Sequence, residues 1–455
     1  MTLDRGDKDG LERPIGSVAE LAGYFRAGEK AAPAFRVGLE HEKIALASES
    51  GAPVAYEGEH GIGAILRDLG AREGWQPVDE AGRIVALDRD GASVTIEPGG
   101  QLELSGAPSA TVHEIARELR AHLDAAKAVG ERHGVVWIAL GAQPLHETDT
   151  LPRMPKERYR IMRAYLPTRG ALALDMMHAT ASVQASYDYS DEADAVAKMR
   201  AALGLGPVVN ALYANSSLYA GKASGYVSRR LAIWRQTDPD RCGGVPFVFD
   251  PDFGYERYTR WALDVPMFFI VRDGRYTPLG RTTFREFLER GHEGERATLA
   301  DFDRHLTTLF PDVRLKRLIE VRGADSVPVD LVLSVPALWK GLLYDADARA
   351  AAFALVAGWS AAEREAAYDA VARRGLRAVA GGRRVIDLAR EVVAIAATAL
   401  RRLAARDGAG RDESVFLDAL RPVLDAGRSP GEEVLERWEG AWQRDPRRLI
   451  ADTRY

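Results

Sequence analysis

The sequence predicts a mixed α+β fold, in which helices cover a sheet of half-buried strands. Several segments alternate apolar and polar residues with a period of two, as strands with one buried face do. Other segments repeat apolar residues three or four positions apart, which is typical of amphipathic helices. After about Ser334 the composition shifts to Ala, Arg and Leu, so the last part of the chain is expected to be helical.

The elements follow one another without a long linker or a repeat. Residues 1–16 are expected to form a loose arm. Helices are expected at Val18–Arg26, Gly61–Leu69, Thr111–Val129, Asp191–Leu203 and Glu432–Trp442. Strands are expected at Phe35–Leu46, within Trp75–Leu104, and at Val135–Leu140, Thr180–Asp188 and Leu315–Val321. Asp238–Tyr255, rich in Gly, Pro and Asp, is predicted to be a long loop.

The chain is expected to form one domain with two parts. Residues 1–345 would make the catalytic sheet core, and residues 346–455 a helical section packed on the same domain. The alternative for the helical section is a separate regulatory module. With 455 residues, of which 46% are hydrophobic, the chain can bury a large core.

Composition also limits the possible partners and locations. Lys and Arg number 61 against 66 for Asp and Glu, so the overall charge gives no reason to expect a nucleic-acid partner. The longest apolar run, Val392–Leu400, is too short to span a membrane, and Met1–Arg13 lacks the apolar stretch of a secretory signal. One cysteine, Cys242, cannot form an intrachain disulfide. A cytoplasmic protein with no membrane partner is therefore expected.

Carboxylates recur on one face of the predicted strands. In Phe35–Leu46, Glu40 and Glu42 point to the same side, about 7 Å apart, because two residues of strand advance the chain by that distance. In the run Glu97–Leu104, Gln101 and Glu103 share a face, and a Pro-Gly-Gly step places Glu97 at a bend.

Two further strands repeat the pattern. Glu320 and Arg322 share one face, and the segment Thr180–Asp188 carries hydroxyl, amide and carboxylate groups on its own polar face, including Gln184. Any one such strand is adequately explained by a solvated sheet face. Four together favour an oxygen-rich site for Mg²⁺, with Mn²⁺ as the alternative, and such sites usually serve phosphate chemistry.

Basic residues near these strands could bind anionic substrates. The candidates are Arg158, Arg160, Arg229, Arg230, Arg314, Lys316, Arg317 and Arg322. The sequence has no Gly-x-x-x-x-Gly-Lys-Ser/Thr loop and no Gly-x-Ser-x-Gly motif. A nucleotide would therefore have to bind to a fold outside the P-loop class. From these residues alone we expect a magnesium-dependent phosphotransfer enzyme or ligase.

Several motifs resemble those of the plant-type glutamate–cysteine ligases, a family that also occurs in bacteria. They are VGLEHEK at residues 37–43, EPGGQLELSGAP at 97–108, MPKERY at 154–159, FVFD at 247–250, ALDVPM at 262–267 and RLKRLIEVRGAD at 314–325. The resemblance covers about residues 15–450. It implies a glutamine-synthetase-like carboxylate–amine ligase fold, with a curved, largely antiparallel sheet forming a funnel and helices outside.

The resemblance also implies the reaction. ATP would activate the γ-carboxylate of L-glutamate as γ-glutamyl phosphate, and the amine of L-cysteine would displace phosphate, which is the first step of glutathione synthesis. Residue by residue, it implies metal binding by Glu40, Glu42, Glu97, Glu103 and Glu320. It implies substrate contacts by Arg158, Gln184, Arg230 and Trp234, and phosphate contacts by Lys316 and Arg322.

Two alternatives accompany this hypothesis. A related ligase would keep the fold and the phosphate chemistry but accept a different amine. A binding or scaffold protein without activity would have lost some metal-binding acids, yet all five are present. The protein is expected to be a monomer or a homodimer.

Overall fold

A nine-stranded antiparallel sheet forms the centre of the molecule. The computed structural model describes residues 11–455. The strands of the sheet are β1 (Val37–Ala47), β2 (Gln76–Glu80), β3 (Arg83–Arg89), β4 (Ala92–Ile96), β5 (Leu102–Ser105), β6 (Val135–Ile138), β7 (Ser182–Tyr187), β14 (Val313–Leu315) and β15 (Ile319–Asp325). Eight of them run in the order β14-β15-β7-β1-β5-β4-β3-β2, and β6 pairs with the second half of β1. This path ends at β14 and β2 and does not close into a barrel. The predicted mixed fold with a largely antiparallel sheet is confirmed.

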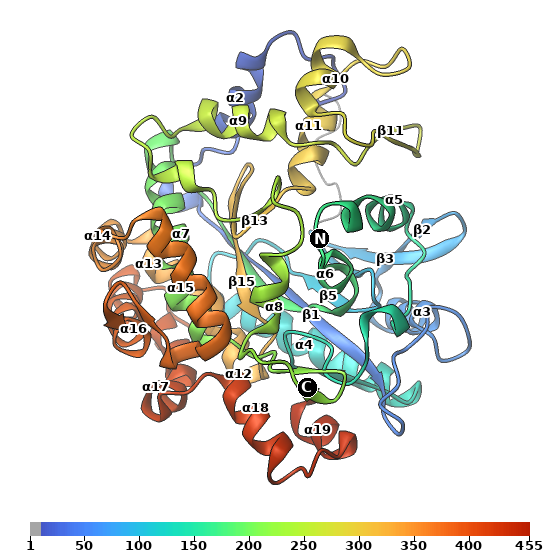
Figure 1. Ribbon diagram of the computed structural model, residues 1–455, viewed down its shortest axis with the longest axis vertical. Helices are drawn as coiled ribbons and strands as arrows, with labels where there is room; N and C mark the ends of the chain where they lie inside the picture. Colours follow the sequence, from blue (N-terminus) through green and yellow to red (C-terminus); the bar gives the residue numbers. More distant parts are fainter. Residues whose placement is uncertain (1–10) are drawn as a thin grey trace.

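Helices cover the sheet and extend beyond it. Before β15 they are α2 (Val18–Arg26), α3 (Ile62–Glu73), α4 (Val112–Arg132), α5 (Glu157–Tyr165), α6 (Ala173–Ala179), α7 (Glu192–Leu212), α8 (Arg229–Trp234), α9 (Tyr255–Asp264), α10 (Phe284–Arg290) and α11 (Leu299–Thr307). After β15 they are α12 (Val329–Val332), α13 (Ser334–Tyr344), α14 (Ala346–Ala354), α15 (Ala361–Arg374), α16 (Val385–Leu403), α17 (Arg421–Ala426), α18 (Pro430–Glu439) and α19 (Pro446–Thr453). Figure 1 shows α13 to α17 gathered on one flank, opposite the β2–β3 hairpin. None of the described helices is both long and apolar enough to cross a bilayer.

Short two-stranded pairs complete the secondary structure. They are β8 (Leu218–Tyr219) with β9 (Lys222–Ala223), β10 (Cys242–Gly243) with β13 (Phe310–Pro311), β11 (Phe269–Arg272) with β12 (Arg275–Pro278), and β16 (Val379–Ala380) with β17 (Arg383–Arg384). The predicted loop Asp238–Tyr255 contains β10 and a 3₁₀ turn. A fully buried ion pair between Asp238 and Arg241, 2.7 Å apart, stabilises the start of this segment.

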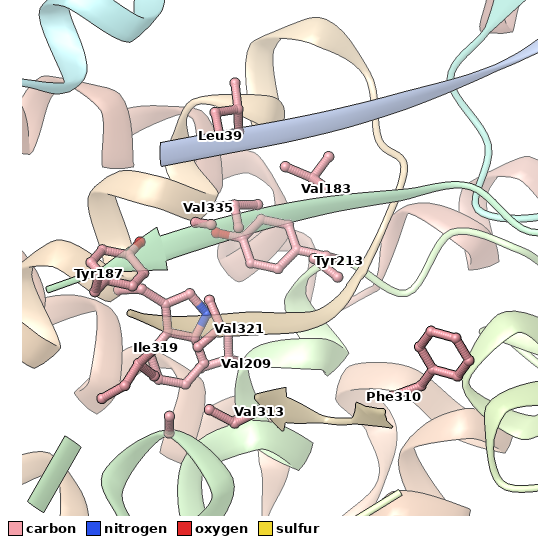
Figure 2. Close-up of a cluster of buried hydrophobic side chains, with 14 of the residues drawn as sticks. Leu39, Val183, Tyr187, Val209, Tyr213, Phe310, Val313, Ile319, Val321 and Val335 are labelled. Carbon is pink, nitrogen blue, oxygen red and sulfur yellow. The ribbon is translucent and has the colours of Figure 1, made fainter. Parts of the chain in front are cut away.

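The apolar faces of the central strands pack against the helices behind them. Figure 2 shows side chains of β1, β7 and β15 lying against side chains from the ends of α7 and α13, namely Leu39, Val183, Tyr187, Ile319 and Val321 with Val209, Tyr213 and Val335. All of these are at most 3% exposed. Because alternate side chains of a strand point to opposite faces, this packing turns Glu40, Gln184 and Glu320 to the other side.

Three expectations from the sequence are corrected by the fold. The segment Leu315–Val321 is not one strand. It turns at Lys316, whose amide donates to the Leu318 carbonyl, so β14 and β15 form a hairpin. Periodicity cannot distinguish a continuous strand from two strands joined by a tight turn. Helix α7 continues nine residues beyond Leu203, through Pro207, because burial outweighs the low helix propensity of Gly and Pro there.

The third correction concerns the N-terminal arm. Residues 1–10 of the arm lie outside the described part of the chain, whereas Pro14 pairs with Thr298 and Leu11 is buried. The end of the arm is therefore packed rather than loose. The other helices and strands that the sequence predicts lie within a few residues of their expected bounds; α4, for example, begins with a capping box at Thr111.

Candidate active site

The register of four neighbouring strands brings the predicted acids together. Glu42 of β1 lies directly opposite Glu103 of β5, and Glu40 lies opposite Gln184 of β7. Glu320 of β15 lies opposite Ser186, two residues further along β7. Side chains of directly opposed residues are about 4.5–5.5 Å apart at Cβ. The polar faces predicted separately for these strands therefore form one continuous surface.

Glu97 joins this surface from the turn between β4 and β5. The turn Pro98–Gly100 follows it, and Gly100 has a left-handed φ of 89°. A Cβ added to Gly99 would lie 2.1 Å from the carbonyl oxygen of His178 in α6, so only glycine allows this close approach. The bend predicted from the Pro-Gly-Gly step thus packs on α6 and turns Glu97 towards the cavity described next.

Two adjoining cavities open over the polar surface. The smaller, which we call the acid cavity, has a volume of about 60 Å³. It is lined by Glu40, Glu42, Glu97, Glu103, Gln184, Arg230, Trp234, Arg314 and Arg322, with an apolar wall of Met162, Met176, Met177 and Phe310. The larger, which we call the basic cavity, has a volume of about 820 Å³ and is lined by Arg158, Lys316, Arg317 and Glu320 among others. Glu40 and Thr307 line both cavities.

The structure therefore separates the predicted residues into two groups. Most of them line the acid cavity. Arg158 and Lys316 line the basic cavity, so Arg158, a predicted glutamate contact, lies apart from Arg230 and Trp234. Glu320 lines the basic cavity as well. Sequence spacing gave no sign of this division, because it depends on how helix α5 sits over the sheet.

Burial and mutual repulsion make the acid cavity unfavourable for negative charge. Burial, together with the carboxylates of Glu103 and Glu320, raises the pKa of Glu40 to about 7. Burial, together with Glu103 and Glu97, raises the pKa of Glu42 to about 8. The hydroxyl of Ser182 donates to Glu42 at 2.9 Å, and that of Ser105 donates to Glu103 at 2.9 Å. These donors are neutral, so they add no positive charge to offset the repulsion between the acids.

Glu320 differs from the other acids because two arginines neutralise it. Arg314 lies 2.6 Å and Arg322 2.8 Å from the same carboxylate oxygen. Although burial opposes ionisation, these two guanidinium groups hold the pKa of Glu320 at about 2. The shared face predicted for Glu320 and Arg322 is confirmed. Arg314 was only one of several basic candidates in the sequence, and nothing there singled it out as the partner of Glu320.

Arg230 supports the strand that carries Arg322. Its guanidinium donates to the carbonyl oxygens of Arg322 and Gly323, where the pairing of β15 with β7 shifts register. Such an irregularity redirects the side chains next to it. Asp325, at the end of β15, accepts hydrogen bonds from Ser216 and Ser228 and so ties the strand to the start of α8.

Several polar atoms at the cavities are buried without a hydrogen-bond partner among residues 11–455. They are Oε1 of Gln184, Nε1 of Trp234, Nε of Arg230, and Nε and one terminal nitrogen of Arg158. Buried polar groups without partners are rare in folded proteins, and each calls for an explanation. At the wall of a cavity, the simplest explanation is that a polar ligand satisfies them.

The remaining candidates have structural surroundings. Arg160 is exposed and paired with Glu157, and Arg229 is paired with Asp175. His178 lies in α6, with its Nε2 3.4 Å from a terminal nitrogen of Arg163. Burial raises the pKa of the Cys242 thiol to about 12, so this thiol stays protonated and is a poor nucleophile.

Comparison with solved structures identifies the fold. The crystal structure of the glutamate–cysteine ligase of Francisella tularensis in complex with AMP superposes with a TM-score of 0.51, at 11% sequence identity. The superposition covers 92% of this chain and 88% of that one. The antiparallel sheet with its outer helices therefore has the fold of that structure.

The sequence itself gives the family. The model of the glutamate-cysteine ligase family 2 (GCS2) matches residues 36–451. The chain is 41% identical to the chloroplastic glutamate–cysteine ligases of Brassica juncea and Arabidopsis thaliana, over 93% of its own length. The matched part makes up 81% and 80% of those two proteins. This chain belongs to glutamate-cysteine ligase family 2.

Proposed function

We propose that this enzyme joins the γ-carboxylate of L-glutamate to the amine of L-cysteine at the expense of ATP. Family membership supports the reaction. The structural observation that carries the proposal is the pair of adjoining cavities that share Glu40. One is small, acidic and partly apolar. The other is large, and its lining combines seven basic with six acidic side chains, so an amino acid and a nucleotide with its cation could meet at their common wall.

The basic cavity suits the nucleotide. Its volume of about 820 Å³ lies within the range of small-molecule sites, whereas the acid cavity of about 60 Å³ has room only for a few water-sized groups and the end of an amino acid. Arg158 and Lys316 present positive charge there, and two nitrogen atoms of Arg158 lack partners in the described part of the chain. A polyphosphate could satisfy them.

The acids fit a divalent cation that arrives with the nucleotide. Burial and repulsion raise the pKa values of Glu40 and Glu42, and a cation between them would relieve that repulsion. Among residues 11–455, no three acidic, imidazole or thiol groups are close enough to form a complete metal shell. Mg²⁺ commonly uses one or two carboxylates and takes its other ligands from phosphates and water. The carboxylates would come from Glu40, Glu42, Glu97, Glu103 and Glu320, with no more than two of them on any one ion, and Mn²⁺ could replace Mg²⁺.

The residues of the chain would act by positioning and by charge. In the first step a γ-carboxylate oxygen of glutamate bonds to the γ-phosphorus, and ADP leaves. In the second, the cysteine amine attacks the acyl carbon, phosphate leaves, and the amine loses a proton. When bound, a divalent cation neutralises phosphate oxygens during the transfer. Arg322 and Lys316 would stabilise negative charge, and Gln184, Arg230 and Trp234 would orient glutamate.

Phosphate release tests this function. Purified enzyme with ATP, Mg²⁺ and L-glutamate should release phosphate rapidly only when L-cysteine is added, and mass spectrometry should detect γ-glutamylcysteine. Equal rates with several other amines would favour the related ligase with a different acceptor. No release with any amine would refute the proposal. Loss of phosphate release in EDTA, with recovery on addition of Mg²⁺ or Mn²⁺, would support the proposed cation requirement.

A matched pair of arginines tests the assignment of the basic cavity. Arg158 and Arg160 lie on the same helix, but Arg158 lines the cavity and Arg160 is exposed. Arg158→Ala should raise KM for ATP about 10- to 100-fold, the equivalent of one charged hydrogen bond. Arg160→Ala should leave it unchanged. Equal effects of the two changes would remove Arg158 from the nucleotide site.

The cytoplasmic location and the monomeric or homodimeric state stay predictions from the sequence.

A further inference from the structure

The segment after α19 packs behind the acid-bearing strand. The amide of Tyr455 donates to the carbonyl of Trp137 at 2.9 Å, and Arg454 forms a β-bridge with Ile138. Trp137 and Ile138 belong to β6, which pairs with β1. Tyr455 therefore lies beside the sheet, on the side away from the acids, and it lines neither the acid cavity nor the basic cavity.

The Tyr455 hydroxyl connects two segments that both lead into the site. It lies 2.8 Å from Nε2 of His41 in β1. It also lies 2.9 Å from the carbonyl oxygen of Val327 and 2.9 Å from the hydroxyl of Ser326, the residues that follow β15. The Val327 carbonyl can only accept, so it takes the Tyr455 proton, and Ser326 gives its own proton to the Glu42 carbonyl. In the tautomer with a proton on Nε2, His41 then donates to the tyrosine oxygen. The two rings meet edge to face, with centroids 4.9 Å apart.

The segments that Tyr455 contacts are next to the acids in the chain. His41 stands between Glu40 and Glu42, with its side chain on the opposite face of β1. The Ser326 hydroxyl donates to the carbonyl oxygen of Glu42 at 2.8 Å. Ser326, which donates to Glu42, and Val327, which accepts from Tyr455, directly follow β15, the strand of Glu320, so both hydrogen bonds are made at the end of that strand.

We propose that Tyr455 is a positioning residue, which fixes the spacing between the acids of β1 and Glu320 of β15 from behind the sheet. The inference rests on the proposed function, because the acids matter only if they bind a cation. In the sheet, β7 lies between β1 and β15 and pairs with both. The contacts of Tyr455 with His41 and Val327 add a second connection between β1 and the end of β15.

Divalent-cation binding tests this role apart from turnover. Tyr455→Phe keeps the ring and removes the hydroxyl, and Ser326→Ala removes the link to Glu42. Tyr213→Phe is the control, because the Tyr213 hydroxyl is also buried and bonded, 3.0 Å from the hydroxyl of Ser334, but lies outside both cavities. Mn²⁺ binding is measured by electron paramagnetic resonance with L-glutamate present, and thermal unfolding and steady-state kinetics are measured in parallel.

The two test variants should bind Mn²⁺ about tenfold more weakly, which is the usual effect of losing a residue that orients metal ligands. Tyr213→Phe should bind Mn²⁺ as the wild type does, even if its melting temperature falls equally. Wild-type affinity in Tyr455→Phe, or equal losses in all three variants, would overturn the inference. If the proposed function itself is wrong, the wild type will form no γ-glutamylcysteine, and this result separates that failure from a failure of the positioning role.

Discussion

Replacing Glu42 by glutamine should stabilise the metal-free enzyme while it removes activity. Glu42 lies opposite Glu103, and burial and its acidic neighbours raise its pKa to about 8. Glutamine has almost the same shape, and its carbonyl oxygen can still accept the hydrogen bond from Ser182. The substitution therefore removes the free-energy cost of burying an ionisable carboxyl group beside other acids, with little loss of packing.

The magnitude follows from the pKa and depends on pH. An unfolded glutamate ionises near pH 4.5, whereas the folded Glu42 keeps its proton until about pH 8. Between these values the folded state binds more protons than the unfolded state, so Glu42 lowers stability as pH rises. At about 1.4 kcal/mol per pH unit, the cost is about 1 kcal/mol at pH 5.5 and about 4 kcal/mol at pH 8.

Urea unfolding in EDTA at the two pH values measures this directly. Glu42→Gln should raise the free energy of unfolding by about 3 kcal/mol more at pH 8 than at pH 5.5. Glu59→Gln, an exposed control, should change it by less than about 0.5 kcal/mol at either pH. A gain that is absent, or the same at both pH values, would refute the electrostatic reasoning. Retained ligase turnover would remove Glu42 from the site.

Two further substitutions examine neighbouring acids. Glu103→Gln should largely abolish turnover while the circular dichroism spectrum stays that of the folded protein, because Glu103 is buried, lines the acid cavity and lies opposite Glu42. Activity near the wild-type level would contradict its role. Arg314→Met should lower the free energy of unfolding by about 3–5 kcal/mol in urea, since it removes one of two cations from the buried Glu320 and two hydrogen bonds to backbone carbonyls. Unchanged stability would mean that Arg322 alone neutralises Glu320.

Local patterns in the sequence were sufficient for the polar faces of the strands. The alternation around Glu40, Gln184 and Glu320 predicted which side chains point away from the core, since the two-residue period of a strand is a local property. The same two-residue period puts His41 on the opposite face, where it is buried. Helix α4 was also predictable, because its capping residue and apolar spacing lie within one segment.

The hairpin at Lys316 could not be predicted in the same way. The residues from Val313 to Val321 suit strand throughout, and only pairing between β14 and β15 fixes the turn. The length of α7 also depended on burial against other elements, which overrode the weak propensity of Pro207.

The sequence by itself determined which acids this chain has, which face of each strand they occupy, and the family to which it is similar. Only the tertiary structure decided that Glu42 lies opposite Glu103, that Arg158 and Lys316 line a separate cavity, and that Tyr455 reaches His41 across 414 positions. The reason is physical. The face of a strand follows from bond geometry between neighbouring residues, whereas register and long-range contacts follow from packing among elements far apart in the chain.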